Sequence, residues 1–113
     1  MSPWRIYVSG PMTGMPELNF PLFNRCAAQL RHRGFAVVNP AEITIGADAR
    51  WDVCLRADIR ELVGCSALAM LPGWEQSKGA RLEHHIGVEL GLTILPFEDW
   101  IALPIRSTHE LST

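Results

Sequence analysis

The stretch LAMLPGWEQSKGARLE, residues 68–83, gives the clearest indication of the fold. It begins with an apolar run that stops at Pro72, which is typical of a buried strand that enters a loop. A helix is expected next, because Ser77 is a good N-cap residue, and Glu83 lies in its second turn. A strand, a loop and a helix in this order form the repeating unit of a parallel α/β sheet.

The same alternation of strand and helix continues on both sides of this stretch. Strands are predicted at residues 4–8, 35–38, 66–71 and 92–95, and helices at 20–33, 51–64, 78–90 and 97–103. This alternation favours an α/β fold with a parallel sheet of four to five strands and helices on both faces.

Local signals set the ends and faces of these helices. Asn19 is expected to cap the first helix, and Pro21 to lie in its first turn. The second helix is expected to bury a stripe made of Leu55, Ile59, Leu62 and Val63. Segment 41–50 is expected to be a loop, and segment 104–113 a loosely held polar tail.

Length and composition fit one compact domain. The chain has 113 residues, of which 48% are hydrophobic and 19% are charged, and its formal net charge is −2. We expect a single domain over residues 1–113, with its core at about 4–103. No block of Lys and Arg is present, which argues against a nucleic-acid polymer as partner, whereas a free nucleotide stays compatible.

The remaining composition argues against membranes and metals. No apolar run approaches the roughly 20 residues of a membrane span, and the first residues lack the apolar core of a signal peptide. The cysteines Cys26, Cys54 and Cys65 lack the close pairs that a zinc site needs, and are expected to be buried in a reducing compartment. We therefore expect a cytoplasmic protein whose cysteines do not form a zinc site.

Polar loops follow three of the predicted strands. Segment 9–18 follows the first strand, Asn39-Pro40 the second, and segment 72–77 the third. Ligands bind parallel α/β sheets at the carboxyl ends of the strands, where these segments would meet. This edge is therefore the expected place of a functional site.

Glu83 is the first candidate for chemistry at this edge. Gly79 and Gly87 lie one turn before and one turn after it, and each glycine costs about 1 kcal/mol in a helix relative to alanine. Such a cost favours close approach by a ligand or another element, and a solvated helix carboxylate is the simple alternative.

Asp58 is the second candidate. It lies at the edge of the buried stripe of the second helix, where an isolated charge is costly unless it is paired or functional. Its simple alternative is a surface ion pair with Arg56 or Arg60. Two carboxylates in different surroundings suit acid–base chemistry at a glycosidic bond, since one stays ionised while the other manages a proton.

Three other side chains are expected near these carboxylates. Tyr7 lies in an apolar strand, where its hydroxyl needs a partner, and Glu83 would provide one. Ser77 is either a helix cap alone or also an anion ligand, since both roles use the same end of the helix. Trp74 would either stack on a base or pack as a lid.

Several familiar signatures are absent from the sequence. Segment 10–14, GPMTG, is neither a P-loop nor a GxGxxG motif. His84 and His85 are adjacent, so they point in different directions on a helix and lack the spacing of a metal pair. A surface or interface position is the expected role of these histidines.

The ordered set of motifs resembles the nucleoside 2-deoxyribosyltransferase superfamily. The matching residues are Tyr7 to Pro11 (YVSGP), Pro40, Asp58, and Ser77-x-Gly79-Ala80-x-x-Glu83. The chain looks closest to a short branch with SGPMTG and LPGWE motifs, and the similarity spans about residues 5 to 95.

The resemblance implies a flavodoxin-like three-layer sandwich and a homodimer or higher homo-oligomer. It implies that Glu83 attacks C1′ of a (deoxy)ribosyl group, that Tyr7 orients Glu83, and that Asp58 assists the leaving base or holds the sugar. Ser77 matches a serine that related deoxynucleoside 5′-monophosphate N-glycosidases use near the phosphate. The remaining substrate contacts would come from Gly10, Pro11, Met12, Trp74 and Gly79. No metal or cofactor is implied.

Two other functions stay open at this point. The same scaffold could be a catalytically silent module that binds or senses a nucleotide. A flavin-binding protein is a more distant alternative, which rests on fold analogy alone.

Overall fold

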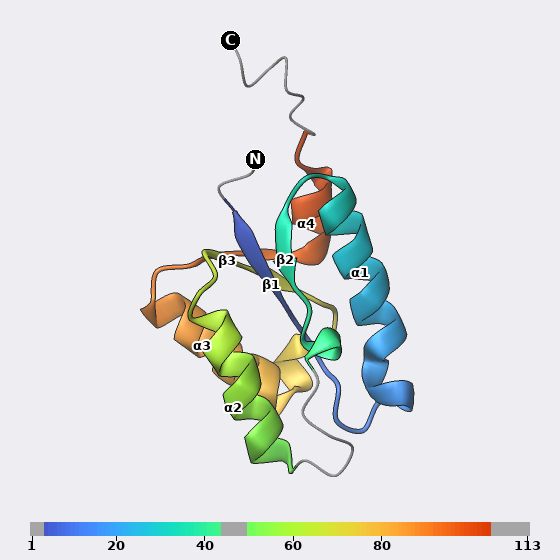
Figure 1. Ribbon diagram of the computed structural model, residues 1–113, viewed down its shortest axis with the longest axis vertical. Coiled ribbons are helices and arrows are strands. Elements are labelled where there is room, and N and C mark those ends of the chain that lie inside the picture. Colours follow the sequence, from blue (N-terminus) through green and yellow to red (C-terminus); the bar gives the residue numbers. More distant parts are fainter. Residues whose placement is uncertain (1–3, 44–49, 105–113) are drawn as a thin grey trace.

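The computed structural model describes residues 4–43 and 50–104 (Figure 1). Strands are β1 (Arg5–Ser9), β2 (Ala36–Val38), β3 (Ala67–Met70) and β4 (Thr93–Pro96). Helices are α1 (Phe20–His32), α2 (Trp51–Leu62), α3 (Lys78–Glu89) and α4 (Phe97–Ala102). Three short 3-10 helices lie between them: η1 (Pro16–Asn19), η2 (Pro40–Glu42) and η3 (Trp74–Gln76). All eight predicted strands and helices are thereby confirmed, with ends that differ by one or two residues.

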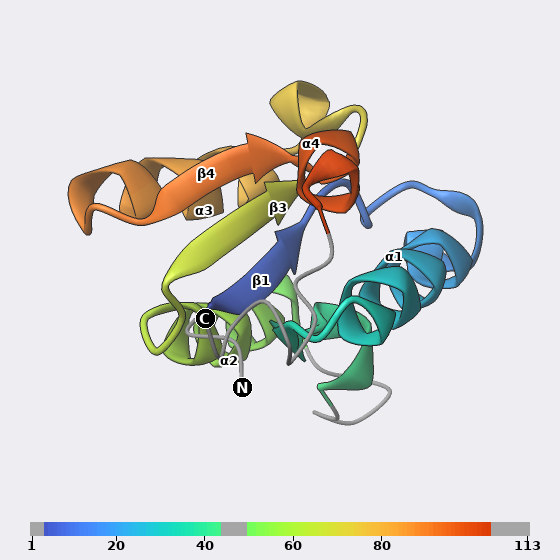
Figure 2. The ribbon, with the colours of Figure 1, turned by 90° about the horizontal axis from the view of Figure 1, so that it is seen from above.

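The four strands form one parallel sheet in the order β2-β1-β3-β4. Figure 2 shows β1, β3 and β4 side by side and pointing the same way. The chain moves from β1 to β2 on one side and then crosses to β3 on the other, so the strand order reverses at β1 and β3. The predicted flavodoxin-like α/β fold is confirmed, and ligands of such sheets bind at this point of reversal.

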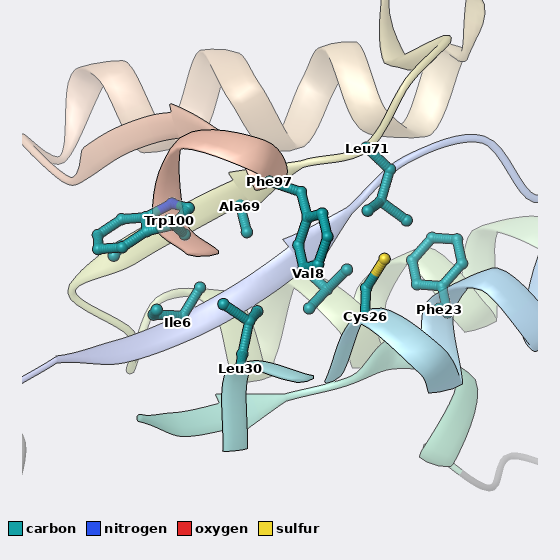
Figure 3. Packing of buried hydrophobic residues seen from close by; sticks show 10 residues of the cluster. Ile6, Val8, Phe23, Cys26, Leu30, Ala69, Leu71, Phe97 and Trp100 are labelled. Carbon is teal, nitrogen blue, oxygen red and sulfur yellow. The ribbon is translucent and has the colours of Figure 1, made fainter. Parts of the chain in front are cut away.

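Alternate residues of β1 face opposite layers of helices. Ile6 and Val8 belong to a buried cluster with side chains of α1 and α4, which Figure 3 shows from close by. Tyr7 belongs to a second buried cluster on the other face, where α2 and α3 pack. Figure 1 shows α1 and α4 on one side of the strands and α2 and α3 on the other, so the predicted helices on both faces are confirmed.

The N-terminal end of α1 differs from the prediction. Pro21 lies in the first turn as expected, but Asn19 makes no side-chain cap. The chain enters α1 through Glu17, Leu18 and Asn19, all with positive φ, and an N-cap normally has extended backbone. The Asn19 amide instead donates from Nδ2 to the carbonyl of Pro11 at 2.9 Å, so it ties the loop after β1 to the helix.

The predicted buried stripe of α2 is found only in part: Leu55 and Ile59 are half-buried, and the prediction is wrong at Val63. Leu62 is fully buried, whereas Val63 lies just beyond the helix and is 56% exposed. Neighbouring helical residues differ in direction by about 100°, so a fully inward Leu62 turns the next side chain toward solvent.

Segment 41–50, which is predicted to be a loop, begins differently in the structure. Its first residues belong to η2, where Asn39 caps the turn by accepting from the Ala41 N–H, and residues 44–49 lie outside the described part of the chain. Most of the expected tail, residues 105–113, lies outside it as well. Within the described residues, no helix is both long and apolar enough to cross a membrane.

Candidate functional site

The centre of the candidate site is the carboxylate of Glu83, which is only 5% exposed. The Tyr7 hydroxyl donates to its Oε2 at 2.6 Å, and the Ser9 hydroxyl donates to its Oε1 at 2.7 Å. These lengths are typical of hydrogen bonds to a charged acceptor. Both donors are fully buried, so the protein itself holds each oxygen of the carboxylate. The expected partnership of Tyr7 and Glu83 is confirmed.

Gly87, one turn after Glu83, lets α3 lie close against the sheet. A Cβ added to Gly87 would stand 2.5 Å from Cδ1 of Leu68 on β3. The expected close approach is therefore found at Gly87. At Gly79 the nearest atoms are the side chains of Leu55 and Trp51, at 3.9 and 4.0 Å, which are ordinary contact distances.

Asp58 reaches the same place from α2. It is partly buried, its charge raises the pKa of Tyr7, and the charge of Glu83 acts on it in turn. Burial, and then repulsion by Glu83, raise the pKa of Asp58 to about 7. Within residues 4–43 and 50–104 it forms no ion pair, so the alternative of a pair with Arg56 or Arg60 is not seen.

Burial also raises the pKa of Glu83 to about 7, although the bonds from Tyr7 and Ser9 oppose the rise. The pKa of Tyr7 is raised well above its usual value, first by burial and then by the charge of Glu83. Tyr7 therefore stays a neutral donor, while two carboxyl groups that influence each other both titrate near neutrality. Perturbed carboxyl groups in one place are a common sign of a functional site.

The raised pKa of Asp58 predicts that Asp58→Asn stabilises the protein at high pH. Below the pKa of the unfolded chain, near 4, both states hold the proton and the substitution gains nothing. As pH rises toward 7, the folded wild type keeps a proton that the unfolded chain releases, so the wild type loses stability. At pH 8 we expect a gain of about 1 kcal/mol in the variant, which allows for partial exposure of the carboxyl group.

Urea unfolding of both proteins at pH 4 and pH 8 measures this difference. Asp99→Asn, at an exposed position in the first turn of α4, is the matched control and should show no gain at pH 8. Equal pH dependence of stability in the wild type and Asp58→Asn would contradict the prediction.

The loops after β1 and β3 touch at the carboxyl edge of the sheet. A Cβ on Gly10 would stand 2.7 Å from Cβ of Leu71, and one on Gly73 would stand 3.5 Å from the ring of Pro11. Met12, by contrast, packs against the cluster on the α1 and α4 face of the sheet. The structure therefore brings Gly10 and Pro11 to the expected edge, whereas the Met12 side chain faces the layer opposite to Glu83.

Trp74 already has an aromatic partner. It packs against the cluster that contains Tyr7, and its ring stacks on that of His84, with 4.4 Å between centroids and 17° between planes. A depression of about 240 Å³ lies beside it at the ends of β3 and β4, and Glu83 does not line it. His84, which was expected at a surface or an interface, is thus half-buried under Trp74.

Ser77 caps α3 as predicted. Its side-chain oxygen accepts from the Ala80 N–H at 3.2 Å, and its backbone is extended as in a usual N-cap. The first turn of α3 therefore begins at the carboxyl edge of the sheet, one turn before Glu83.

One family of known proteins matches this chain. A family model described as "Domain of unknown function (DUF4406)" matches residues 4–96. This chain belongs to the DUF4406 family. No curated protein matches it. The DUF4406 match spans all four strands and α1 to α3, and therefore includes Tyr7, Asp58 and Glu83.

Ser9 also belongs to this site of the DUF4406 chain, although the sequence analysis did not predict it. It was grouped with Gly10 and Pro11 as the start of a loop, although it is the last residue of β1. Residues two apart in a strand point to the same face, so a strand that extends to Ser9 places its hydroxyl beside that of Tyr7. That periodicity was the signal that could have found it.

No group of three or more His, Cys, Asp or Glu side chains placed to hold a metal ion occurs among residues 4–43 and 50–104.

Proposed function

We propose that this DUF4406 protein is an N-glycosyl hydrolase or transferase that acts on a (deoxy)nucleoside or a nucleoside 5′-monophosphate through Glu83. The observation that carries the proposal is the buried Glu83 carboxylate, hydrogen-bonded to Tyr7 and close enough to Asp58 for their charges to interact. The resemblance of the motifs to the nucleoside 2-deoxyribosyltransferase superfamily supports the choice of bond.

In the proposed reaction, a Glu83 oxygen forms a bond to C1′ of the sugar while the bond from C1′ to the base nitrogen breaks. The electron pair of the broken bond leaves with the base. Water or a second base then attacks C1′ and releases Glu83 as a carboxylate, as in retaining glycosidases. Each carboxylate oxygen has two acceptor positions, so the bonds from Tyr7 and Ser9 leave room for a new bond.

Asp58 is the proposed acid for the leaving base. A group donates a proton best when its pKa lies near the working pH, and the Asp58 pKa of about 7 meets that condition. The same carboxylate can take a proton from the attacking water in the second step. Burial raises the pKa of both carboxyl groups to about 7, so the proposed division of roles rests on their contacts: Glu83 accepts hydrogen bonds from Tyr7 and Ser9 that hold its two oxygens and oppose the rise.

The first turn of α3 is the proposed site for a phosphate. Helix N-termini favour anions through their free N–H groups and their dipole. The Ser77 side-chain oxygen accepts a hydrogen bond from the Ala80 N–H, and its own O–H can still donate to a ligand. Trp74, beside this turn, is the proposed aromatic wall for a base.

The burial of Glu83 favours a second candidate function. With 5% exposure and both oxygens bonded inside the protein, Glu83 also fits a structural role in a catalytically silent nucleotide-binding module. That module would use the edge near Ser77 and Trp74 without chemistry at Glu83.

Liquid chromatography of free base tests the two functions. The purified protein is incubated with a panel of nucleosides and deoxynucleosides and their 5′-monophosphates, and thermal unfolding is followed with the same panel. Release of base from at least one compound supports the enzyme. Stabilisation by a nucleotide without any released base supports the silent module and removes the enzyme.

A homo-oligomer is part of the proposal, because α2 and α3 leave large apolar side chains on the surface. Trp51 is 41% exposed and Val88 55% exposed. Apolar side chains of this size on neighbouring helices are common at interfaces between subunits. Sedimentation equilibrium should give a mass of at least twice 12.6 kDa, and a monomer at micromolar concentration would remove this part of the proposal.

A further inference from the structure

Ser9 is an unusual residue for its position. It is fully buried at the end of the central strand β1, in a sequence whose neighbours Ile6, Tyr7 and Val8 are fully buried too. A buried hydroxyl without a partner is costly, and Ser9 donates its hydroxyl to Oε1 of Glu83 at 2.7 Å. Among the described residues, every buried side-chain polar atom has such a partner, so this bond satisfies both groups.

The second donor restricts the carboxylate in a way that Tyr7 alone does not. A carboxylate held through one oxygen can still swing the other about that contact. With Tyr7 on Oε2 and Ser9 on Oε1, two donors from the same strand hold both ends of the group. Strand β1 is itself paired on both sides, by β2 and β3, so the two donors keep a fixed spacing.

The same bond favours the charged form of Glu83. Donors to a carboxylate lower its pKa, and here they oppose the rise caused by burial. Of the described groups, Tyr7 on β1 and Asp58 on α2 are the titratable side chains whose pKa the charge of Glu83 raises, and Tyr7 stays neutral. Ser9 is therefore a donor without a charge of its own, which makes its effect separable from that of Asp58.

We propose that Ser9 is a positioning residue, whose hydroxyl holds the second oxygen of Glu83 so that the carboxylate is presented in one orientation. This inference deepens the proposed function and rests on it for the catalytic consequence. The bond and the ionisation can be tested without any substrate.

The test is a titration of the Glu83 carboxyl carbon by ¹³C NMR, with Glu83→Gln used to assign the signal. Ser9→Ala removes the donor with little change of volume, and we expect it to raise the Glu83 pKa by about one unit. Ser9→Cys keeps a weak donor and should give a midpoint between those of the wild type and Ser9→Ala. Ser66→Ala is the matched control, because its hydroxyl contacts the backbone of Arg5 instead of Glu83.

Base release gives a second readout. In Ser9→Ala, the acidic limb of the pH profile of kcat should move up by the same amount, so the rate at pH 6 falls about tenfold. KM should stay the same, because a fully buried Ser9 does not touch the substrate.

An unchanged Glu83 midpoint in Ser9→Ala overturns the inference, and so does an equal rise in Ser66→Ala, which would mean a general loosening of the fold. If the wild type releases no base from any compound, the proposed function fails while the titration still decides the role of Ser9. If the wild type is active and the midpoint does not move, the proposed function stands without Ser9.

Discussion

Glu83→Gln is expected to abolish base release, with a loss of more than about a thousandfold in kcat. The amide has nearly the shape of the carboxylate and can still contact Tyr7 and Ser9. It lacks the negative charge that attacks C1′, so the first step of the proposed reaction stops. Chromatography of free base, on whichever compound of the panel the wild type cleaves, measures the loss.

Glu89→Gln is the matched control for this substitution. Glu89 lies on the same helix, α3, at an exposed position, and its replacement should leave the rate within about twofold. A 2-fluoro-2-deoxynucleoside adds a second check, since the wild type should gain the mass of the sugar while Glu83→Gln gains none. A Glu83→Gln variant that keeps a tenth of the wild-type rate would contradict the proposed mechanism.

Gly10→Ala is expected to destabilise the fold by about 2–3 kcal/mol. The new Cβ would stand 2.7 Å from Cβ of Leu71, next to the backbone, where no side-chain rotation relieves the clash. Leu71 is fully buried and its N–H donates to the Ser9 carbonyl, so it has little freedom to move. Urea unfolding at pH 7 measures the change.

Gly64→Ala serves as the control for Gly10→Ala. The nearest atom to a Cβ at Gly64 is the Glu61 carbonyl oxygen at 3.6 Å, an ordinary contact. Replacing a glycine whose conformation alanine can adopt changes stability by less than about 1 kcal/mol, usually upward. If Gly10→Ala unfolds at the same urea concentration as the wild type, the two loops do not meet as tightly as the structure shows.

The sequence predicted the fold well because its signals are local and repeat. Each apolar run of strand length ends in Gly, Pro or a polar turn, and each helix follows within one loop. The contact between Tyr7 and Glu83 could also be predicted. A tyrosine in an apolar strand and a glutamate between helical glycines each need a partner, and the parallel sheet brings their elements together.

The wrong predictions for Asn19 and Ser9 share a different cause, because tertiary contacts determine the conformation of both residues. Asn19 has the right type and position for a cap, but left-handed backbone turns its side chain toward Pro11. Ser9 belongs to β1 because it pairs with Met70 of β3. In the sequence, the adjacent Gly10 suggests instead that the strand has already ended. Residue preferences alone do not encode which neighbour a short polar side chain finds.

The position of β1 bears on how a ligand could reach Glu83. Strands paired on both sides belong to the part of a protein whose amides exchange hydrogen most slowly, because exposing them requires unfolding of most of the domain. Tyr7 and Ser9 therefore lie on one of the two inner strands, β1 and β3, which are expected to open last; β1 has β2 on one side and β3 on the other. Any opening that admits a sugar to Glu83 has to come from the helical layer, where breathing of α2, α3 or η3 takes far less free energy than breaking the sheet.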